Sequence, residues 1–286
     1  MPFATINGIR IHYLIQGSGP HLLAFAPGGF RSVISRWTAA GGKGIFGDMD
    51  ALAALSRHYT VIAYDRRESG LSGGRIEPLS WDLYVEEARG LLDLAGAGKA
   101  YVLGGSMGAS LALALAARHP SRCKGLLLHR PVGGYRWLMQ VRSLFQRHID
   151  FVRAQGLQAV VARAPRGENF FLDAEIGPWG SLAAIDPEFA SGLAQQAVEP
   201  YLEIVTRSRD ALFPDTMPSG ASGAELIEIR VPALIMAGAD AAHATSAAWA
   251  LKELMPNALL WDVLPPHQSA HNTLARFLPF TSELEK

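Results

Sequence analysis

One serine stands between two glycines in the segment with the clearest chemical signal. In Tyr101-Val-Leu-Gly-Gly-Ser-Met-Gly, Gly104 and Gly108 flank Ser106 at a spacing of two residues, between an apolar run and an Ala/Leu-rich stretch. This spacing at a strand-to-helix junction is typical of a nucleophile elbow, a sharp turn at which glycines remove side chains that would collide. The start of the following helix favours negative charge that develops during attack. Ser106 is therefore the candidate nucleophile.

A serine hydroxyl is a weak nucleophile near neutral pH, so it needs a histidine base and a carboxylate that orients the base. Asp240 follows the apolar run 231–237, which places it at the end of a predicted strand. His267 follows in the loop LPPHQSAHN, and His271 competes for the same role but falls in a predicted helix. His243, three residues after Asp240, is interpreted as a turn or helix-start residue. The predicted triad is Ser106, Asp240 and His267.

The elements that must position these residues alternate along the chain. Apolar runs of strand length, separated by helical periodicity, lie at 3–6, 9–16, 21–26, 59–64, 100–103, 125–129, 231–237 and 259–264. Strands that alternate with helices indicate a mostly parallel α/β sheet flanked by helices. The alternation stops near Pro131 and resumes at Val231. We therefore predict a core of residues 1–130 and 231–286, with a helical lid at 131–230 inserted after the sixth strand.

The chain resembles the α/β-hydrolase family in these segments and in two further ones. Pro27-Gly28-Gly29-Phe30, just after a predicted strand, is similar to the family's oxyanion loop, and Asp65-Arg66-Arg67-Glu68-Ser69-Gly70 is similar to its Asp-x-Arg-Gly-x-Gly turn. The resemblance implies that the oxyanion hole is made by the N–H of Met107 and by that of Gly29 or Phe30. It implies no metal and no cofactor. The charges of the second segment are interpreted as structural, and Glu68 is a minor candidate for specificity at the cleft rim.

Composition limits the partners. The chain has 26 basic and 26 acidic residues and a formal charge of zero, so nucleic acid is not an expected partner. We expect a small-molecule substrate, no membrane association and a cytoplasmic location, because no signal segment is apparent and the single cysteine fits a reducing compartment. The sequence leaves a homodimer open. Six arginines and one acid, Asp150, lie between Arg136 and Arg166 of the lid, where they could hold a carboxylate or form a solvated helix face.

These observations predict a serine hydrolase that cleaves a small, largely apolar ester or lactone through an acyl-enzyme. Two alternatives remain open from the residues alone. The first is a carbon–carbon bond hydrolase acting on a diketone-like acid, because that reaction can use the same triad. The second is a non-catalytic ligand receptor built on a hydrolase fold.

Overall fold

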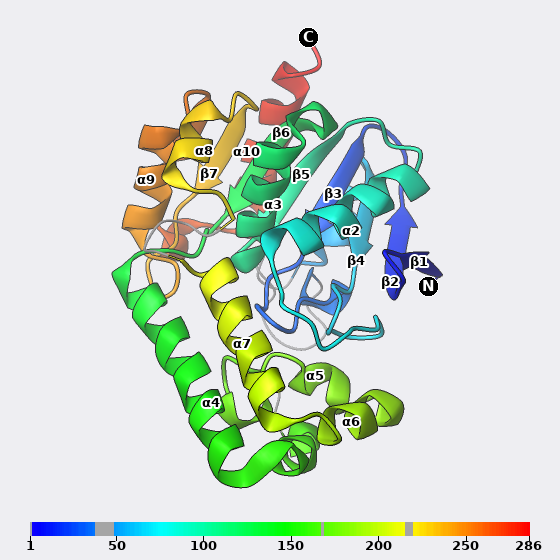
Figure 1. Ribbon diagram of the computed structural model, residues 1–286. Coiled ribbons are helices and arrows are strands. Elements are labelled where there is room, and N and C mark those ends of the chain that lie inside the picture. Colours follow the sequence, from blue (N-terminus) through cyan, green and yellow to red (C-terminus); the bar gives the residue numbers. More distant parts are fainter. Residues whose placement is uncertain (1, 38–48, 167–168, 215–219) are drawn as a thin grey trace.

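A single mostly parallel sheet forms the centre of the molecule (Figure 1). The structure is a computed structural model that describes residues 2–37, 49–166, 169–214 and 220–286. The strands lie in the order β1-β2-β4-β3-β5-β6-β7-β8, in which β2 is antiparallel to both of its neighbours and all other neighbours are parallel. In chain order the strands are β1 (Phe3–Ile6), β2 (Ile9–Gln16), β3 (His21–Phe25), β4 (Thr60–Tyr64), β5 (Ala100–Gly105), β6 (Cys123–His129), β7 (Ala233–Met236) and β8 (Ala258–Trp261).

Helices follow most of the strands from β4 onward, and a group of them separates β6 from β7. In chain order the α-helices are α1 (Ala51–Leu55), α2 (Trp81–Leu94), α3 (Met107–Arg118), α4 (Tyr135–Arg163), α5 (Gly180–Ala183), α6 (Pro187–Ala194), α7 (Val198–Leu212), α8 (Gly223–Glu228), α9 (Thr245–Leu254) and α10 (Ala270–Glu283). Short 3-10 helices are η1 (Ile34–Trp37), η2 (Pro120–Arg122), η3 (Ala164–Arg166), η4 (Ala174–Ile176) and η5 (Pro265–His267).

The two faces of the sheet are covered by different helices because alternate strand residues point to opposite sides. In β3, Leu23 and Phe25 join a core cluster that includes buried residues of α2 and α3. Leu22 and Ala24 of the same strand join a second cluster with buried residues of α1 and α10. The sheet is thus buried on both faces, as expected for parallel strands.

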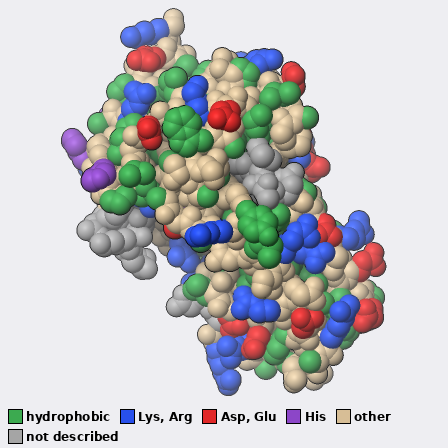
Figure 2. All heavy atoms as spheres, turned by 90° about the vertical axis from the view of Figure 1, so that its left-hand side faces the viewer, with side chains coloured by type: hydrophobic (Ala, Val, Ile, Leu, Met, Phe, Trp, Pro, Cys, Tyr) green, Lys and Arg blue, Asp and Glu red, His purple; other side chains and the backbone are tan. Residues whose placement is uncertain are grey.

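The segment between β6 and β7, which we call the helical insert, contains α4 to α8 and extends beyond one end of the sheet (Figure 1). Its first helix, α4, bends at Gly156, whose φ of 76° is outside the helical region. Basic and acidic side chains are interspersed over the smaller lobe at the bottom of Figure 2, to which the insert contributes. The structure confirms the predicted mostly parallel sheet with flanking helices and a helical insert after the sixth strand.

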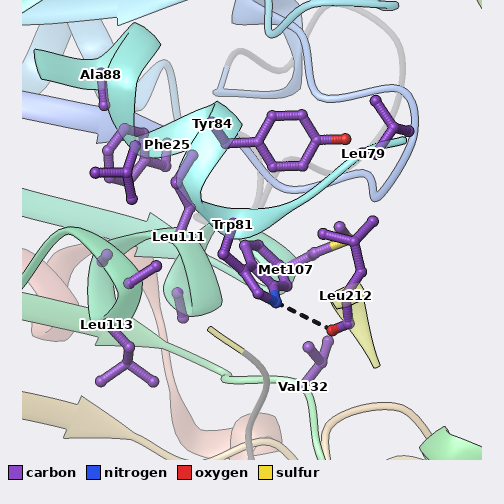
Figure 3. Close-up of a cluster of buried hydrophobic side chains, with 14 of the residues drawn as sticks. Phe25, Leu79, Trp81, Tyr84, Ala88, Met107, Leu111, Leu113, Val132 and Leu212 are labelled. Atoms are coloured by element: carbon purple, nitrogen blue, oxygen red, sulfur yellow. Dashed lines mark hydrogen bonds between the residues drawn. The ribbon is translucent and has the colours of Figure 1, made fainter. Parts of the chain in front are cut away.

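The insert is joined to the core close to the start of α3. The indole Nε1 of Trp81 donates a hydrogen bond to the backbone oxygen of Leu212, at the end of α7, over 3.1 Å. The backbone N–H of Leu79 donates to Ser208 Oγ, also in α7, over 2.9 Å. Figure 3 shows the Trp81–Leu212 bond beside Met107, the residue that follows the candidate nucleophile. These contacts fix α7 against the core next to the site.

Within the described ranges, no helix is both long enough and apolar enough to cross a bilayer. This bears only on membrane-spanning helices.

Candidate active site

Ser106 occupies the turn between β5 and α3, as the sequence predicts. Its φ and ψ are 55° and −123°, a strained combination for a residue with a side chain. The backbone N–H of Ser106 is fixed by a 2.9 Å hydrogen bond to the oxygen of His129. A Cβ on Gly104 would lie 2.3 Å from the oxygen of Gly108, and one on Gly108 would lie 2.2 Å from the oxygen of Phe25. Both glycines are therefore required by close backbone approach.

The side chain beside the nucleophile is His243. Its Nε2 lies 2.8 Å from Ser106 Oγ, and its Nδ1 lies 2.9 Å from both carboxylate oxygens of Asp240. When Nδ1–H donates to Asp240, Nε2 is left to accept the proton of the serine hydroxyl. The arrangement has the connectivity of a nucleophile, a base and an orienting acid.

One short loop between β7 and α9 carries both Asp240 and His243. Asp240 Oδ1 accepts hydrogen bonds from the backbone N–H groups of Ala242 and His243, at 2.9 and 3.0 Å, which closes a tight turn. The turn brings the ring of His243 back over the carboxylate. On its other side, Gly133 pairs with His243 as an isolated bridge, and the N–H of Gly133 donates to Ala242. The loop is thus held both internally and by the segment that leads into the insert.

The electrostatics of this loop favour an ionised Asp240. Partial burial raises the pKa of the Asp240 carboxyl, but hydrogen bonds from the ring and backbone of His243 and from Ala242 outweigh burial and bring the pKa below its usual value. The side chain of Asp240 is 62% exposed, whereas that of His243 is 22% exposed. The acid can therefore orient the ring while remaining charged at neutral pH.

His267 and His271, the two histidines considered for the base, lie elsewhere. His267 is exposed on η5, and His271 is exposed in the first turn of α10. Among the described residues neither ring forms a hydrogen bond with Ser106, whose hydroxyl is bonded to His243. This geometry corrects the sequence-based choice: the base position next to Ser106 is occupied by the histidine that was interpreted as a turn residue. The reason is the tight turn at Asp240, which allows a histidine three residues later to reach the carboxylate.

The loop after β8 is attached to the sheet edge by a different residue. Gln268 Nε2 donates to the backbone oxygens of Ala237 and Val263, at 2.9 and 2.5 Å, and its Oε1 accepts from Arg130 Nε at 3.2 Å. Gln268 therefore connects its own loop to the residue that follows β7 and to the residue that follows β6. The adjacent His267 is left facing solvent.

The loop after β3 lies on the other side of the nucleophile. Gly28, Gly29, Ser106 and Met107 all line the same cavity, whereas the ring of Phe30 is fully buried. Arg66 Nη2 donates to the oxygen of Gly29 over 2.7 Å. Because the C=O and N–H of a trans peptide point in opposite directions, this bond directs the N–H of Phe30 away from Arg66. Among the described residues, neither Gly29 nor Phe30 donates its N–H to a protein group, so both remain available to a ligand.

Asp65, the residue before Arg66, holds its turn together through hydrogen bonds. Asp65 accepts hydrogen bonds from the N–H groups of Ile34 and Leu71, at 2.7 and 2.9 Å, and from His12 Nδ1 at 2.8 Å. Glu68 is fully buried and does not line the cavity, so its predicted position at the cleft rim is wrong. Burial raises its pKa to about 7, despite the nearby Arg66 and Arg67.

A cavity of about 440 Å³ opens onto the serine. It is large enough for a small organic ligand. Its lining comes from the core, the Asp240–His243 loop and the insert, and consists of Gly28, Gly29, Arg36, Ser106, Met107, Trp137, Gln140, Leu144, Arg147, Asn169, Phe171, Leu172, Ala242 and His243. Across the described parts of the chain, no three His, Cys, Asp or Glu side chains are grouped as a metal site would require.

Comparison with known proteins agrees with the fold. A family model described as "alpha/beta hydrolase fold" matches residues 40–266. The chain belongs to this family, and it is a hydrolase of the α/β fold.

Individual relatives are more distant. RutD of Azorhizobium caulinodans, described provisionally as a carbamate hydrolase, is 27% identical over 275 residues, which cover 92% of this chain and 89% of that protein. YraK of Bacillus subtilis, an uncharacterized hydrolase, is 32% identical over 133 residues, and the match spans 44% of this chain and less than half, 43%, of YraK. The crystal structure of an enol-lactonase from Burkholderia xenovorans LB400 superimposes with a TM-score of 0.57 and 23% identity, covering 99% and 98% of the two chains. The last likeness concerns the fold alone.

Proposed function

We propose that the protein is a serine hydrolase that cleaves a small, largely apolar ester or lactone through an acyl-enzyme. The observation that carries this proposal is the row of contacts from Ser106 Oγ to His243 Nε2, at 2.8 Å, and from His243 Nδ1 to Asp240, at 2.9 Å. A hydroxyl, an imidazole and a carboxylate in this order can generate a nucleophile at neutral pH without further groups.

In the proposed reaction, His243 Nε2 accepts the proton of Ser106 as the hydroxyl oxygen bonds to the substrate carbonyl carbon. The oxyanion is stabilised by the N–H of Met107, at the start of α3, and by that of Gly29 or Phe30. His243 then gives its proton to the leaving group, and the acyl group remains on Ser106. Water, deprotonated by His243, attacks the acyl-enzyme and releases the acid.

Several features support a largely apolar substrate. The cavity lining includes Met107, Trp137, Leu144 and Phe171, and the ring centroids of Trp137 and Phe171 stack 5.3 Å apart. The insert contributes three of these four side chains. We therefore propose that the helical insert acts as the lid of the site and sets substrate choice.

The test is covalent labelling with an active-serine phosphonate probe, followed by peptide mass spectrometry. We expect one adduct, on Ser106, and its loss in Ser106→Ala and in His243→Ala. Ser121→Ala is the matched control, because Ser121 is an exposed serine on η2 outside the cavity. Absence of an adduct on Ser106 in folded protein would remove the acyl-enzyme proposal.

A substrate panel then separates the reaction classes. Simple esters and lactones should be turned over, and Ser106→Ala should abolish this. Turnover confined to vinylogous diketo acids would instead identify a carbon–carbon bond hydrolase. Ligand binding without labelling or turnover would identify a receptor.

A further inference from the structure

The cavity has a cationic end within the insert, away from the catalytic groups. The stripe of α4 that lines it contains Trp137, Gln140, Leu144 and Arg147, at spacings of three, four and three residues, which is one face of a helix. Ten residues of helix span about 15 Å. The stripe therefore runs from an aromatic residue, through a polar and an apolar one, to an arginine.

The direction of this stripe is set by the start of α4. Gly133, two residues before the helix begins, is bridged to His243, so the first turn lies beside the catalytic loop. Trp137 stacks on Phe171, and a Cβ on Gly29 would lie 2.0 Å from the Phe171 ring, so this end of the stripe also adjoins the loop after β3. Figure 1 shows α4 running from there along the insert. Arg147 is thus at the far end of the cavity.

Among the described residues, the charged side chains Arg36 and Arg147 that line the cavity are both positive. The lining includes no Asp or Glu among the described residues. Helical side chains lean toward the N-terminus of their helix, so Arg147 leans back toward Leu144 and the serine. No described carboxylate lies within ion-pair distance of Arg147.

Arg147 also lines a neighbouring hollow, which contains three acidic side chains. That hollow is also lined by Asp150, Asp173 and Glu175. Arg163 Nε lies 2.7 Å from Asp173 and 3.4 Å from Glu175, and Gln146 donates to Asp150 over 2.8 Å. Asp173 and Glu175 are thus paired with Arg163, Asp150 is bonded to an amide, and within the described residues Arg147 forms an ion pair with none of the three.

A buried amide supplies a second group for an anion. Asn169 is only 6% exposed and lines the cavity. Its Oδ1 accepts the N–H of Phe171 at 2.7 Å, and this bond fixes the amide so that its NH₂ is the group it can offer to a ligand. An arginine and an amide NH₂ are both donors, which suits a carboxylate and not a second cation.

We infer that the protein takes an acyl substrate with a terminal carboxylate, whose ester or lactone carbonyl lies at Ser106 and whose carboxylate is bound by Arg147 and Asn169. The inference rests on the proposed function, because it uses Ser106 as the reacting end. The methylene chain then lies along the middle of the cavity, past Gln140 and Leu144.

The test compares the p-nitrophenyl ester of octanoic acid with the mono-p-nitrophenyl ester of suberic acid, which have the same chain length and differ only in the terminal group. We expect a higher kcat/KM for the suberate half-ester. Arg147→Gln should lower that value about fivefold, the upper range for a solvent-accessible ion pair, and leave the octanoate ester within about twofold. Arg147→Glu should reverse the preference. Arg153→Gln is the matched control, since Arg153 is exposed on the same helix but does not line the cavity.

A binding measurement separates failure of the inference from failure of the proposed function. Calorimetry of octanamide and of the monoamide of suberic acid needs no turnover, and the suberate monoamide should bind more tightly in wild-type protein but not in Arg147→Gln. Equal turnover of the two esters and equal binding of the two amides would overturn the carboxylate site while leaving the hydrolase. Absent turnover with a preference for the suberate monoamide that Arg147→Gln removes would keep the site and overturn the hydrolase.

Discussion

Two loops at the carboxyl edge of the sheet each contain a histidine, yet only one histidine reaches the serine. In the loop after β7, Asp240 closes a turn on itself and holds His243 against Ser106. In the loop after β8, Gln268 makes the inward contacts and His267 faces solvent. The difference teaches that the contact network of a loop, and not the order of residues along the chain, decides which imidazole is available as a base.

The largest effect on kcat should appear when alanine variants of His243 and His267 are compared. His243→Ala should lower kcat by about 10⁴-fold or more, because the serine loses its proton acceptor. His267→Ala should stay within about threefold of wild type. Steady-state kinetics on a p-nitrophenyl ester, with thermal melts to verify folding, measure both. The reverse pattern would return the role of base to His267 and require the loop after β8 to rearrange in solution.

Asp240→Asn should have the second-largest effect, a loss of about 10³-fold in kcat, because an amide can present the wrong hydrogen-bond polarity to Nδ1. The amide oxygen can still accept from the N–H groups of Ala242 and His243, so the turn should persist. Kinetics beside circular dichroism provide the measurement. Activity within a few-fold of wild type in a folded variant would show that the acid is not needed to orient His243.

A variant of Gln268 tests whether the loop after β8 contributes to stability and not to the reaction. Gln268→Ala removes hydrogen bonds to Ala237, Val263 and Arg130 and should lower the free energy of unfolding by about 1–2 kcal/mol. The kcat should change only a few-fold. Denaturant unfolding and kinetics on the same sample test this. A large loss of kcat without loss of stability would mean that the loop takes part in the reaction.

The smallest effect concerns acid stability of the catalytic loop. The pKa of Asp240 is lowered in the fold, so its charged form stabilises the protein above its unfolded pKa of 3.8, and this contribution is lost as pH falls through the folded value. Because the side chain is mostly exposed, the contribution is small. Melting curves of wild type and Asp240→Asn should therefore differ slightly at pH 6 and converge near pH 2. A difference in melting temperature that grows toward low pH would contradict this prediction.

The sequence predicts the parts of this molecule that depend on local pattern. The apolar runs locate the strands, the two glycines around Ser106 locate the elbow, and the end of β7 locates Asp240. The base could not be located in this way, because its position depends on how two loops fold against the same edge. A usable signal existed in the spacing Asp240-Ala-Ala-His243, since an aspartate that closes a turn can bring the third residue onward over its carboxylate.

The predicted position of Glu68 at the cleft rim is wrong for a related reason. A charged residue in a turn resembles a surface residue in sequence, and only the packing reveals that Arg67 lies between Glu68 and Glu87 in the interior. Burial there raises the pKa of Glu87 to about 8 and that of Glu68 to about 7. Burial of a paired charge depends on tertiary packing, and no local sequence pattern predicts it.

The position of Asp240 and His243 on one loop also has a consequence for thermal inactivation of the proposed hydrolase. Because only two residues separate Asp240 from His243, almost no chain entropy is lost in bringing the pair together, in contrast to an acid and a base held on distant segments. Local opening of residues 262–269 would then leave the pair assembled. Heating should abolish activity only when the sheet edge itself melts, so that inactivation reports global unfolding and not the fraying of the last loop.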